Sequence, residues 1–595
     1  MIKRMMAAAV RATTTAVKAT ATSVAATGSV IVNFVNGQVL TGSQLNAIQT
    51  GKVDVISGSA SGLAITAGTV DPTSVMKAIT GNTVSVDAIL LDAHALRRAG
   101  CKLDGVTDDG PAINTLIANI GTTVVTGMPA PTVAMQLPAG TVLFIGTTLQ
   151  TGTVSLSISG GGKDNTVILM KSGGAGVIQH GTTSTPAVGT LQIRDIAFVD
   201  ADILGSGSPA ISAVFSSDLS LFGCLAWLNV FFRYFSQALN ATNVPRDTVW
   251  FNVKAAGPDG AVQALSAFQF TGTTANTFGN FNGLFIQCAG ANYSYVWQYS
   301  SNVPWEGQRF YSCDGYNGWG LVKVWISPTA ISGVTNYQAV GWLFNGCDWQ
   351  GYGFALDMCG CRMIRIDNFY CAVNALPSGT AIPAAPDGTT RSYRSLMSFR
   401  RCGDVEMNGS NFESGGNLDS TSTVVFVNSD VSYFRSSRAR ILVGEQVAGG
   451  FEYASGNSNN VCAALDTYWA EWGGNAGTCV LDHGANQTNQ EAVFYANADI
   501  TVGEVSYTGR YRVVQTAQNV SMDSNHRVAV TFPTRWGTTN PIFIGGAPHL
   551  QWDILGQDTT AGVAYLYDIT STGFTIQFAN ASTATLGIEY TAEGF

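Results

Sequence analysis

The feature that most constrains the fold of this chain is a repeat in which a phenylalanine precedes a cysteine by three residues. It occurs four times, and a looser fifth line has Phe369 two residues before Cys371. The four pairs are Phe285/Cys288, Phe310/Cys313, Phe344/Cys347 and Phe399/Cys402. The cysteines of the five lines are 25, 34, 24 and 31 residues apart. Repeats of this length are typical of solenoids, in which each repeat forms one coil.

The offset of three residues also predicts where each coil bends. In a straight strand, residues three apart point to opposite faces. A Phe and its Cys can therefore both point inward only if the backbone turns a corner between them. We expect such corners, with cysteines inside the coils as free thiols that behave as small hydrophobic residues.

The rest of the chain is consistent with strands and turns. Short apolar or alternating runs of four to seven residues are separated by Gly, Asn, Asp and Ser, which is typical of strands. No helices lie between these runs, so βαβ units are excluded. Stacked sandwiches and a solenoid of coils remain, and the repeat favours the solenoid. The clearest runs are Val142–Ile145, Leu156–Ser159, Val167–Met170, Leu191–Ile196 and Thr248–Val253.

Two segments are expected to be helical. Residues 1–27 can form one helix, although many Thr and Val residues weaken it. The second helix, over Asp108–Ile120, has an aspartate as N-cap and Pro111 near its first position. Ile113, Leu116 and Ile117 would form its apolar face.

Composition excludes several functions. The formal net charge is −9, whereas a nucleic-acid-binding protein needs a basic surface. The best candidate for a membrane span, residues 219–232, has 14 residues, and a span needs about 20. The five histidines are isolated from one another, and the cysteines lack zinc-site spacing. We therefore expect no nucleic acid, no membrane span, no metal and no cofactor.

An ordered series of motifs carries a family resemblance. Asp104-Gly-Val-Thr-Asp-Asp is followed by Ala112-Ile-Asn, then by Leu137-Pro-Ala-Gly-Thr and by Leu156-x-Ile-x-Gly-Gly-Gly. This series resembles the opening of the pectate-lyase-like right-handed β-helices of bacteriophage tailspikes. The resemblance implies that the first helix caps the solenoid and that the acidic run at Asp104 is structural. The chain departs from the family upstream, where Ala93–Lys102 replaces the usual strand and glycine-rich stretch.

The resemblance implies three parts. Residues 1–86 would be an N-terminal virion-attachment segment, because residues 34–46 resemble the segments that join tail fibres to the virion. A cleaved targeting signal is the alternative for the basic N-terminus. Residues 87–485 would form a right-handed parallel β-helix, the receptor-binding or depolymerase domain. Residues 486–595 would form a C-terminal β-sandwich tip for trimerisation or carbohydrate binding.

Residues 293–370 are rich in aromatic side chains and hold half of the 12 tryptophans. Aromatic rings stack on the apolar faces of sugars, and they must otherwise be covered. The sequence therefore predicts carbohydrate contacts in this stretch. The candidate residues are Trp305, Tyr311, Tyr316, Trp319, Trp349 and Tyr352.

Acidic residues in the same stretch are the catalytic candidates. The lines that end in Cys313-Asp314 and Cys347-Asp348 align, so the two aspartates would share one outward position on neighbouring coils. Stacked strands lie about 4.8 Å apart, so both carboxylates cannot ionise freely. A protonated acid beside a carboxylate is what retaining glycoside cleavage needs. Glu306 is a candidate third group. The structural alternative is that each aspartate only forms a turn.

Together these observations predict a homotrimeric tailspike of the virion tail. It would contact phage tail proteins through its N-terminal segment, adsorb to a bacterial surface polysaccharide and cleave it as an endoglycosidase. The alternatives are a non-enzymatic receptor-binding fibre of the same fold, a polysaccharide lyase, and a secreted pectinase-like enzyme.

Overall fold

The computed structural model describes residues 32–34, 38–40, 88–118 and most of 131–594. The gaps in the last range include 217–223, 259–264, 274–279, 444–448, 454–460, 472–477, 483–490, 497–500, 503–509 and 533–542. The chain divides into two compact units, Met1–Val86 and Asp87–Phe595. In the first unit the described strands are β1 (Val32–Phe34) and β2 (Gln38–Leu40), which pair antiparallel. The helix expected over residues 1–27 lies outside the described residues.

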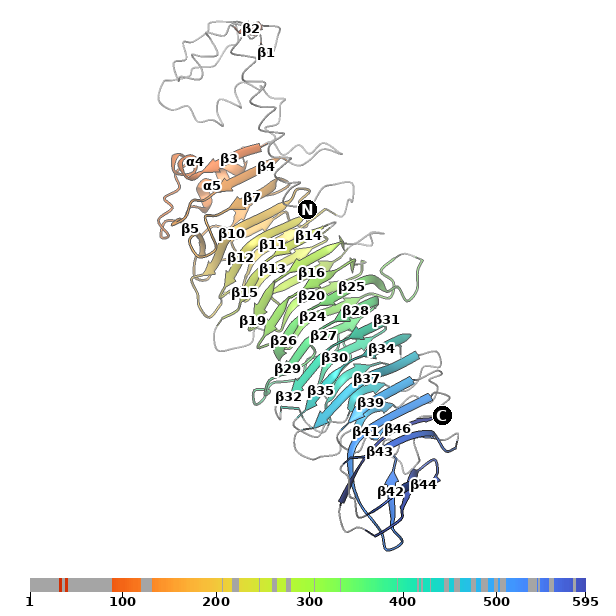
Figure 1. Cartoon of the computed structure of the whole chain (residues 1–595). Coiled ribbons are helices and arrows are strands. Elements are labelled where there is room, and N and C mark those ends of the chain that lie inside the picture. Colours follow the sequence, from red (N-terminus) through yellow and green to blue (C-terminus); the bar gives the residue numbers. More distant parts are fainter. Residues whose placement is uncertain are drawn as a thin grey trace, which may run out of the picture. The chain divides into compact units, whose positions relative to one another are not determined.

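The second unit is a right-handed parallel β-helix, as the sequence predicted (Figure 1). Each coil contributes three strands in turn, and each strand pairs in parallel with its equivalents in the coils before and after. The strands thus form three columns that follow the length of the solenoid.

The first column begins at β3 and continues past the predicted boundary at residue 485, because β39 and β41 still pair in parallel. Its strands are β3 (Ala88–Asp92), β4 (Thr132–Gln136), β7 (Ser155–Ser159), β10 (Leu191–Asp200), β12 (Leu225–Arg233), β14 (Thr248–Phe251), β18 (Gly283–Ile286), β22 (Arg309–Tyr311), β25 (Ala339–Asn345), β28 (Cys361–Asp367), β31 (Gly403–Asn408), β34 (Tyr433–Ser437), β37 (Val461–Glu471), β39 (Glu491–Ala496) and β41 (Arg510–Ser521).

The second column follows directly after the first in each coil, and the longer strands β10, β12 and β37 pair with both columns. Its other strands are β5 (Val142–Ile145), β8 (Val167–Met170), β15 (Lys254–Ala256), β19 (Ala289–Ala291), β23 (Asp314–Tyr316), β26 (Asp348–Gly351), β29 (Tyr370–Val373), β32 (Asn411–Ser414) and β35 (Arg440–Val443).

The third column is a separate 13-stranded parallel sheet. Its strands are β6 (Leu149–Gln150), β9 (Ile178–His180), β11 (Pro209–Val214), β13 (Gln237–Thr242), β16 (Phe268–Gly272), β20 (Tyr295–Ser301), β24 (Gly320–Ile326), β27 (Leu356–Cys359), β30 (Ser395–Arg400), β33 (Thr423–Val427), β36 (Gly449–Tyr453), β38 (Thr478–Asp482) and β40 (Thr501–Val502). A short parallel pair, β17 (Asn280–Phe281) and β21 (Trp305–Glu306), lies outside these columns.

The predicted corner between Phe and Cys is present and has a specific geometry. The residue before Cys313 is Ser312, with a φ of +48°, and its counterparts Gln287 and Gly346 have φ of +54° and +61°. One left-handed residue turns the chain between the first and second columns, so Phe310 and Cys313 are both fully buried. The amide of each corner residue bonds to the next coil, for example Ser312 N to Asn345 O at 2.9 Å.

Three of the five Phe–Cys repeats stack on one another as predicted, and the other two do not. The Phe310 ring lies 4.7 Å from the Phe285 ring and 5.0 Å from the Phe344 ring, measured between centroids. The residue stacked after Phe344 is Ile366, not Phe369 or Phe399. Phe399 instead lies in β30 of the third column, where it pairs with Met358. The sequence lines look alike because both columns end in a left-handed corner, which at Arg401 has a φ of +45°.

Helix α5 (Gly110–Ala118) confirms the helix predicted over Asp108–Ile120. Ile113 and Ile117 are buried in the same core cluster as the first coils, as expected for a cap. A second helix, α4 (Ala93–Arg98), was not predicted; it forms in the stretch that departs from the family pattern, with the Asp92 carboxylate accepting from Ala95 N at 2.7 Å.

The acidic run at Asp104 is structural, as the resemblance implied. The Asp104 carboxylate accepts from the amides of Val106 and Thr107 in its own turn. Asp108 accepts from Gly146 N at 2.8 Å, and Asp109 accepts from Lys102 N at 2.6 Å. Asp104 thus holds its own turn, and the bond from Gly146 to Asp108 ties the start of the helix to the first coils.

The antiparallel strands of the C-terminal region form two sheets. β46 (Thr585–Gly594) pairs with β41 and with β43 (His549–Leu555), while β45 (Gly573–Phe578) pairs with β42 (Arg527–Thr531) and β44 (Ala564–Ile569). The Tyr590 ring of β46 contacts the Phe574 ring of β45 at 5.3 Å. The two sheets therefore pack face to face as a sandwich that continues directly from the last coil.

The first prediction concerns the cysteines. The nine cysteines whose placement is described are all free, and all but Cys224 are buried. Burial raises the pKa of Cys101 to about 12 and that of Cys359 to about 11, which suppresses the reactive thiolate. We expect a thiol-specific chromogenic reagent to find close to 11 thiols per chain in denaturant and very few in the native protein. Recovery of fewer than half in denaturant would show disulfides and contradict this interior.

Candidate functional site

The two aspartates singled out in the sequence share one register position. Asp314 is the first residue of β23 and Asp348 the first residue of β26, and the two are direct Cα partners in the parallel pair. Both side chains are half-buried on the outer side of the second column. Stacking thus places the two backbone positions at the roughly 4.8 Å spacing of neighbouring strands. The carboxyl groups are close enough for the charge of Asp348 to act on Asp314.

The environment of the pair opposes ionisation. Burial, followed by the charge of Asp348, raises the pKa of Asp314, and the Lys254 ammonium partly offsets this rise. Burial also raises the pKa of Asp348, while a 3.2 Å hydrogen bond from Gln350 Nε2 lowers it. The other oxygen of Asp348, Oδ1, is buried and has no hydrogen-bond partner in the described part of the chain. An unsatisfied buried carboxyl oxygen is costly and calls for a proton or a ligand.

Tyrosines flank the pair on both sides. Burial and then the charges of Asp314 and Asp348 raise the pKa of Tyr316, whose side chain is 36% exposed. On the following coil Tyr370 is the Cα partner of Asp348. Burial, a hydrogen bond to Glu413 and its charge raise the pKa of Tyr370 to about 12. The tyrosines therefore remain protonated donors around the carboxyl pair.

Glu413 is a third carboxylate on this face that sequence reasoning missed. Its Oε2 accepts from the Tyr370 hydroxyl at 2.8 Å, and its Oε1 accepts from Asn411 Nδ2 at 3.2 Å. We call Asp314, Asp348, Tyr370 and Glu413 the acidic face. Glu413 belongs to no Phe–Cys line, so the repeat did not indicate it. The parallel register of β29 and β32 brings it within reach of Tyr370, two coils beyond Asp348.

Glu306 lies elsewhere on the coil. It belongs to β21, before the first column, while Asp314 follows the corner after that column. The Tyr337 hydroxyl donates to its carboxylate, and Arg362 is a charged neighbour of Tyr337. The structure therefore groups Glu306 with Tyr337 and not with Asp314 and Asp348.

Three of the aromatic candidates for sugar binding lie in the core, and their prediction as contact residues is wrong. Trp305 and Trp349 are almost fully buried, and Trp319 is 6% exposed. The physical reason is alternation along the strand: Trp349 follows Asp348, so when the aspartate points outward the indole points inward. The Trp305 ring packs against Tyr299 inside the coils, at 5.3 Å between centroids.

The remaining aromatic candidates reach solvent in part. Tyr316 lies beside the acidic face, and Tyr311 is partly exposed on the neighbouring first column. Tyr352 is also partly exposed, and its ring contacts Trp319 edge-on at 6.0 Å. The charges of Asp314 and Asp348 contribute to the raised pKa of Tyr316, which places its hydroxyl near the pair.

The described residues also bear on metal binding and on membrane insertion. They contain no group of three or more His, Cys, Asp or Glu side chains arranged to hold a metal ion. Among the helices in the described ranges, none has the length and hydropathy of a membrane span.

Comparison of the sequence with protein-family profiles and with curated proteins gave no match. Comparison of the fold with solved structures found similar proteins. Tailspike protein 3 of bacteriophage CBA120 is 11% identical over 79% of this chain and 67% of its own, with a TM-score of 0.39. A double mutant of the tailspike of E. coli bacteriophage HK620 is 8% identical, over 82% of this chain and 90% of its own, with a TM-score of 0.41.

An enzyme of a different source is also similar. The catalytic unit of a GH87 alpha-1,3-glucanase from Streptomyces thermodiastaticus is 12% identical over 76% of this chain and 68% of its own, with a TM-score of 0.28. At these identities the likeness is one of fold alone.

The second prediction concerns the cost of the aspartate pair. A carboxyl group whose pKa is raised by folding stabilises the native state below its unfolded pKa of about 3.9, and this stability is lost as pH rises through the folded pKa. At neutral pH the pair is therefore destabilising, because burial opposes the ionised form of both carboxyl groups and the charge of Asp348 repels that of Asp314. We expect Asp348→Asn to raise the thermal unfolding temperature at neutral pH and to leave it unchanged below about pH 4.

Asp404→Asn is the matched control for this prediction. Asp404 is exposed and has a φ of +54°, which asparagine tolerates. Its substitution removes an exposed carboxylate far from the pair and should not raise the unfolding temperature at neutral pH as Asp348→Asn does. A lower unfolding temperature of Asp348→Asn at neutral pH would show that the carboxylate of Asp348 is stabilising and contradict the assignment.

Proposed function

We propose that this chain is a phage tailspike that binds a bacterial surface polysaccharide and cleaves it by glycoside hydrolysis at the acidic face. The observation that carries the proposal is the register of Asp314 and Asp348, which places two carboxyl groups of raised pKa side by side on a partly exposed face. Within the fold, the hydrogen-bonded stack of coils supplies the rigidity that a catalytic pair needs.

The spacing of the pair favours a retaining reaction. Retaining glycosidases hold their two carboxyl groups about 5–5.5 Å apart, and inverting enzymes about 6.5–9.5 Å apart. Direct partners on strands about 4.8 Å apart fit the shorter separation. One carboxylate attacks the anomeric carbon while the other carboxyl group protonates the leaving oxygen, and water then releases the sugar from the enzyme.

The local contacts favour one assignment of roles. Gln350 donates directly to Asp348 and so favours its carboxylate, the form that attacks. Once Asp348 is ionised, its charge holds the proton on Asp314, which becomes the general acid. The Lys254 ammonium lowers the pKa of Asp314 and so opposes its role as the acid. However, Lys254 is exposed and lies two strands from Asp314, so solvent screens its charge.

The remaining parts of the proposal rest on the family resemblance of residues 104–162. The β-helix would act at the host cell surface, with Tyr316 beside the cleavage point as a contact for the sugar chain. Residues 1–86 would join the protein to other proteins of the virion tail. The C-terminal sandwich would support trimer formation or bind carbohydrate.

The third prediction tests cleavage. Asp314→Asn and Asp348→Asn keep the shape of the side chain but remove the proton donor or the nucleophile. Each should lower the release of reducing ends from a polysaccharide that the wild-type protein cleaves, by at least the 10²- to 10⁴-fold of acid–base catalysis. The pH–rate profile of the wild type should be bell-shaped, because one group must be protonated and the other ionised.

Asp404→Asn again supplies the control, since it removes an exposed carboxylate in another corner of the coil and should leave cleavage intact. A panel of capsular and O-antigen polysaccharides provides the substrates. Binding of a polysaccharide without release of reducing ends would instead identify a non-enzymatic receptor-binding fibre. Unsaturated products detected by ultraviolet absorbance would identify a lyase.

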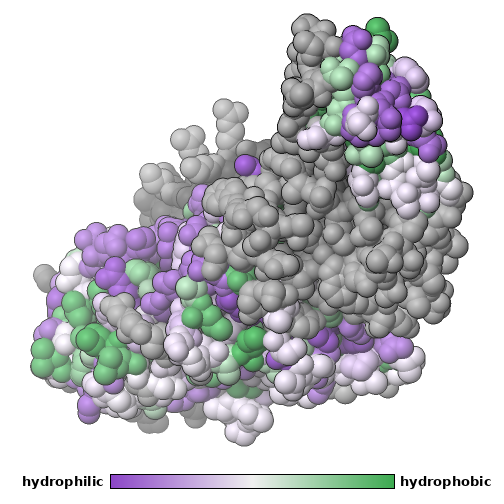
Figure 2. All heavy atoms as spheres, turned by 90° about the horizontal axis from the view of Figure 1, so that it is seen from below, coloured by the Kyte–Doolittle hydropathy of each residue, from purple (hydrophilic) through white to green (hydrophobic). Residues whose placement is uncertain are grey.

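The fourth prediction concerns oligomeric state. Leu228 and Phe251 are exposed side chains at the same register of the first column, and exposed Val249 belongs to the same strand as Phe251. On the face drawn in Figure 2, hydrophobic residues likewise gather in patches among polar ones. Apolar patches on a soluble protein mark interfaces. We expect light scattering to give a trimer of about 187 kDa, three times the 62.4 kDa chain. A monomer at micromolar concentration would refute the trimer.

A further inference from the structure

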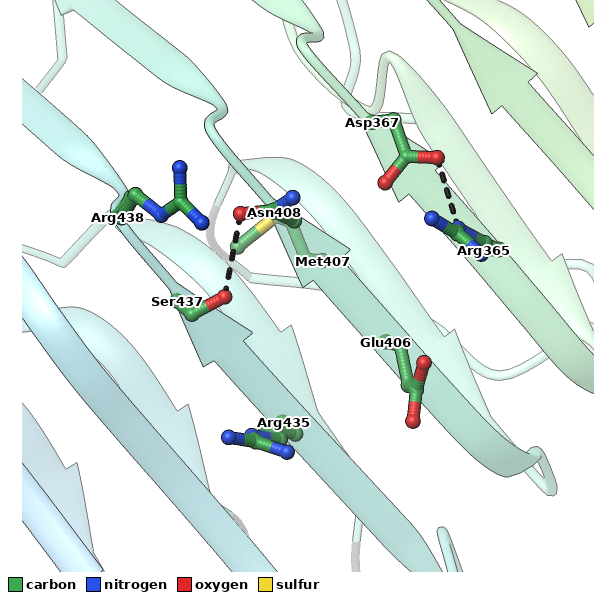
Figure 3. Close-up of a pocket in the computed structure, with 8 residues that line it drawn as sticks. All are labelled: Arg365, Asp367, Glu406, Met407, Asn408, Arg435, Ser437 and Arg438. Atoms are coloured by element: carbon green, nitrogen blue, oxygen red, sulfur yellow. Dashed lines mark hydrogen bonds and ion pairs between the residues drawn. The ribbon is translucent and has the colours of Figure 1, made fainter.

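A separate polar pocket of about 230 Å³ opens on the first column, one column away from the acidic face (Figure 3). Three neighbouring strands form it: β28, β31 and β34. Figure 3 shows the lining residues on these neighbouring strands and at the corner that follows β34. The lining residues are Arg365, Asp367, Glu406, Met407, Asn408, Arg435, Ser437 and Arg438.

The charges of the pocket are arranged by register. Arg365 is the Cα partner of Glu406, and Glu406 is the Cα partner of Arg435, so charges alternate along one row. Arg365 Nε donates to Asp367 Oδ2 at 2.8 Å, which neutralises that carboxylate. Within the described ranges neither Arg435 nor Arg438 forms an ion pair. The pocket therefore holds two exposed guanidinium groups against one carboxylate, Glu406.

Arg438 lies at a corner of the coil. It is the left-handed corner residue of its coil, with a φ of +53°, where the coils before it have Asn368 and Gly409. Arg401 occupies the same kind of left-handed corner with a φ of +45°, so the coils accept a long side chain at this position. The corner directs Arg438 to the rim of the pocket, opposite Asn408, as Figure 3 shows.

Hydrogen bonds prepare the polar groups between the arginines. Ser437 Oγ donates to Asn408 Oδ1 at 3.3 Å, so the Asn408 amide is oriented and its Nδ2 hydrogens remain as donors. Asn408, Arg435 and Arg438 thus present donors to one space. Donors of this kind, with two arginines able to bind in a bidentate manner, suit a carboxylate or a phosphate.

We propose that this pocket binds an anionic group, a carboxylate or a phosphate, carried by a sugar of the polysaccharide. The proposal rests on the proposed function as a polysaccharide-binding protein and adds the chemical class of the glycan. The pocket is smaller than the roughly 300–1,000 Å³ of sites that bury drug-sized ligands, so it accepts one sugar or its charged substituent.

The position of the pocket relative to the acidic face supports a shared ligand. β28 continues through the corner at Asn368 into β29, which carries Tyr370, and β31 continues through Gly409 into β32, which carries Glu413. The same coils therefore hold the pocket on one side of the corner and the tyrosine and glutamate of the acidic face on the other. A glycan chain crossing this corner would contact both.

The test uses three monosaccharides of matched size. Methyl glucuronide carries a carboxylate, glucose 6-phosphate carries a phosphate, and methyl glucoside is neutral. We expect saturation-transfer NMR at low ionic strength to detect binding of at least one anionic sugar to the full-length protein and not of the neutral one. The sugar that binds more strongly distinguishes a carboxylate from a phosphate as the natural group.

Paired substitutions locate the binding. Arg435→Gln together with Arg438→Gln should weaken the anionic sugar at least tenfold, because hydrogen bonds to charged groups contribute about 1.5–3 kcal/mol each. Arg309→Gln is the matched control. Arg309 is exposed and lies outside the pocket, two strands from Arg365 in the same row. This variant should bind the anionic sugar as the wild type does.

Equal binding of the neutral sugar, failure of both anionic sugars to bind, or unchanged binding by the double variant would overturn the proposal. These outcomes are distinct from a failure of the proposed function, because the probes require no cleavage. If the pocket binds an anionic sugar but no polysaccharide releases reducing ends, hydrolysis alone is refuted. If the protein cleaves a neutral polysaccharide but the pocket binds no anionic sugar, the pocket proposal alone is refuted.

Discussion

The in-register parallel pairing of successive coils is the constraint on which the whole molecule depends. Each backbone hydrogen bond between coils fixes a residue directly above its counterpart, as Phe310 is fixed between Phe285 and Phe344. The pairing continues from β3 to β41. Any residue type that recurs at one position of the coil therefore becomes a row, inside the coils as stacked rings and outside them as charges held close together.

The left-handed corner residue separates two outward surfaces of each coil, and we assign a different function to each. It lets Phe310 and Cys313 point into the core together, which leaves Tyr311 and Asp314 on outward faces at either side of the bend. The proposed catalytic pair lies on one side of the corner and the arginine pocket on the other. Because the backbone of both is the same hydrogen-bonded stack, neither site needs loops for its geometry.

Placing like charges in one row has an energetic cost that a functional site can use. Asp314 and Asp348 are each harder to ionise in the folded chain than in water, mainly because they are half-buried and, for Asp314, because of its neighbour. The alternating row of Arg365, Glu406 and Arg435 avoids this cost by changing sign from coil to coil. The contrast between the two rows is one reason to assign catalysis to the first and binding to the second.

Local spacing in the sequence determined a solenoid, a helix near Asp108, the corners and the shared position of Asp314 and Asp348: the signals are apolar periodicity, an N-cap and an offset of three. The right-handed β-helix and the capping role of that helix were implied by the family resemblance of residues 104–162. Only the tertiary structure decided which rows are continuous. It moved Phe399 to another column, placed Trp305 and Trp349 in the core, separated Glu306 from the aspartates and brought Glu413 to Tyr370, the neighbour of Asp348. These outcomes depend on which strand pairs with which, and coils of unequal length leave that pairing unreadable from residue spacing alone.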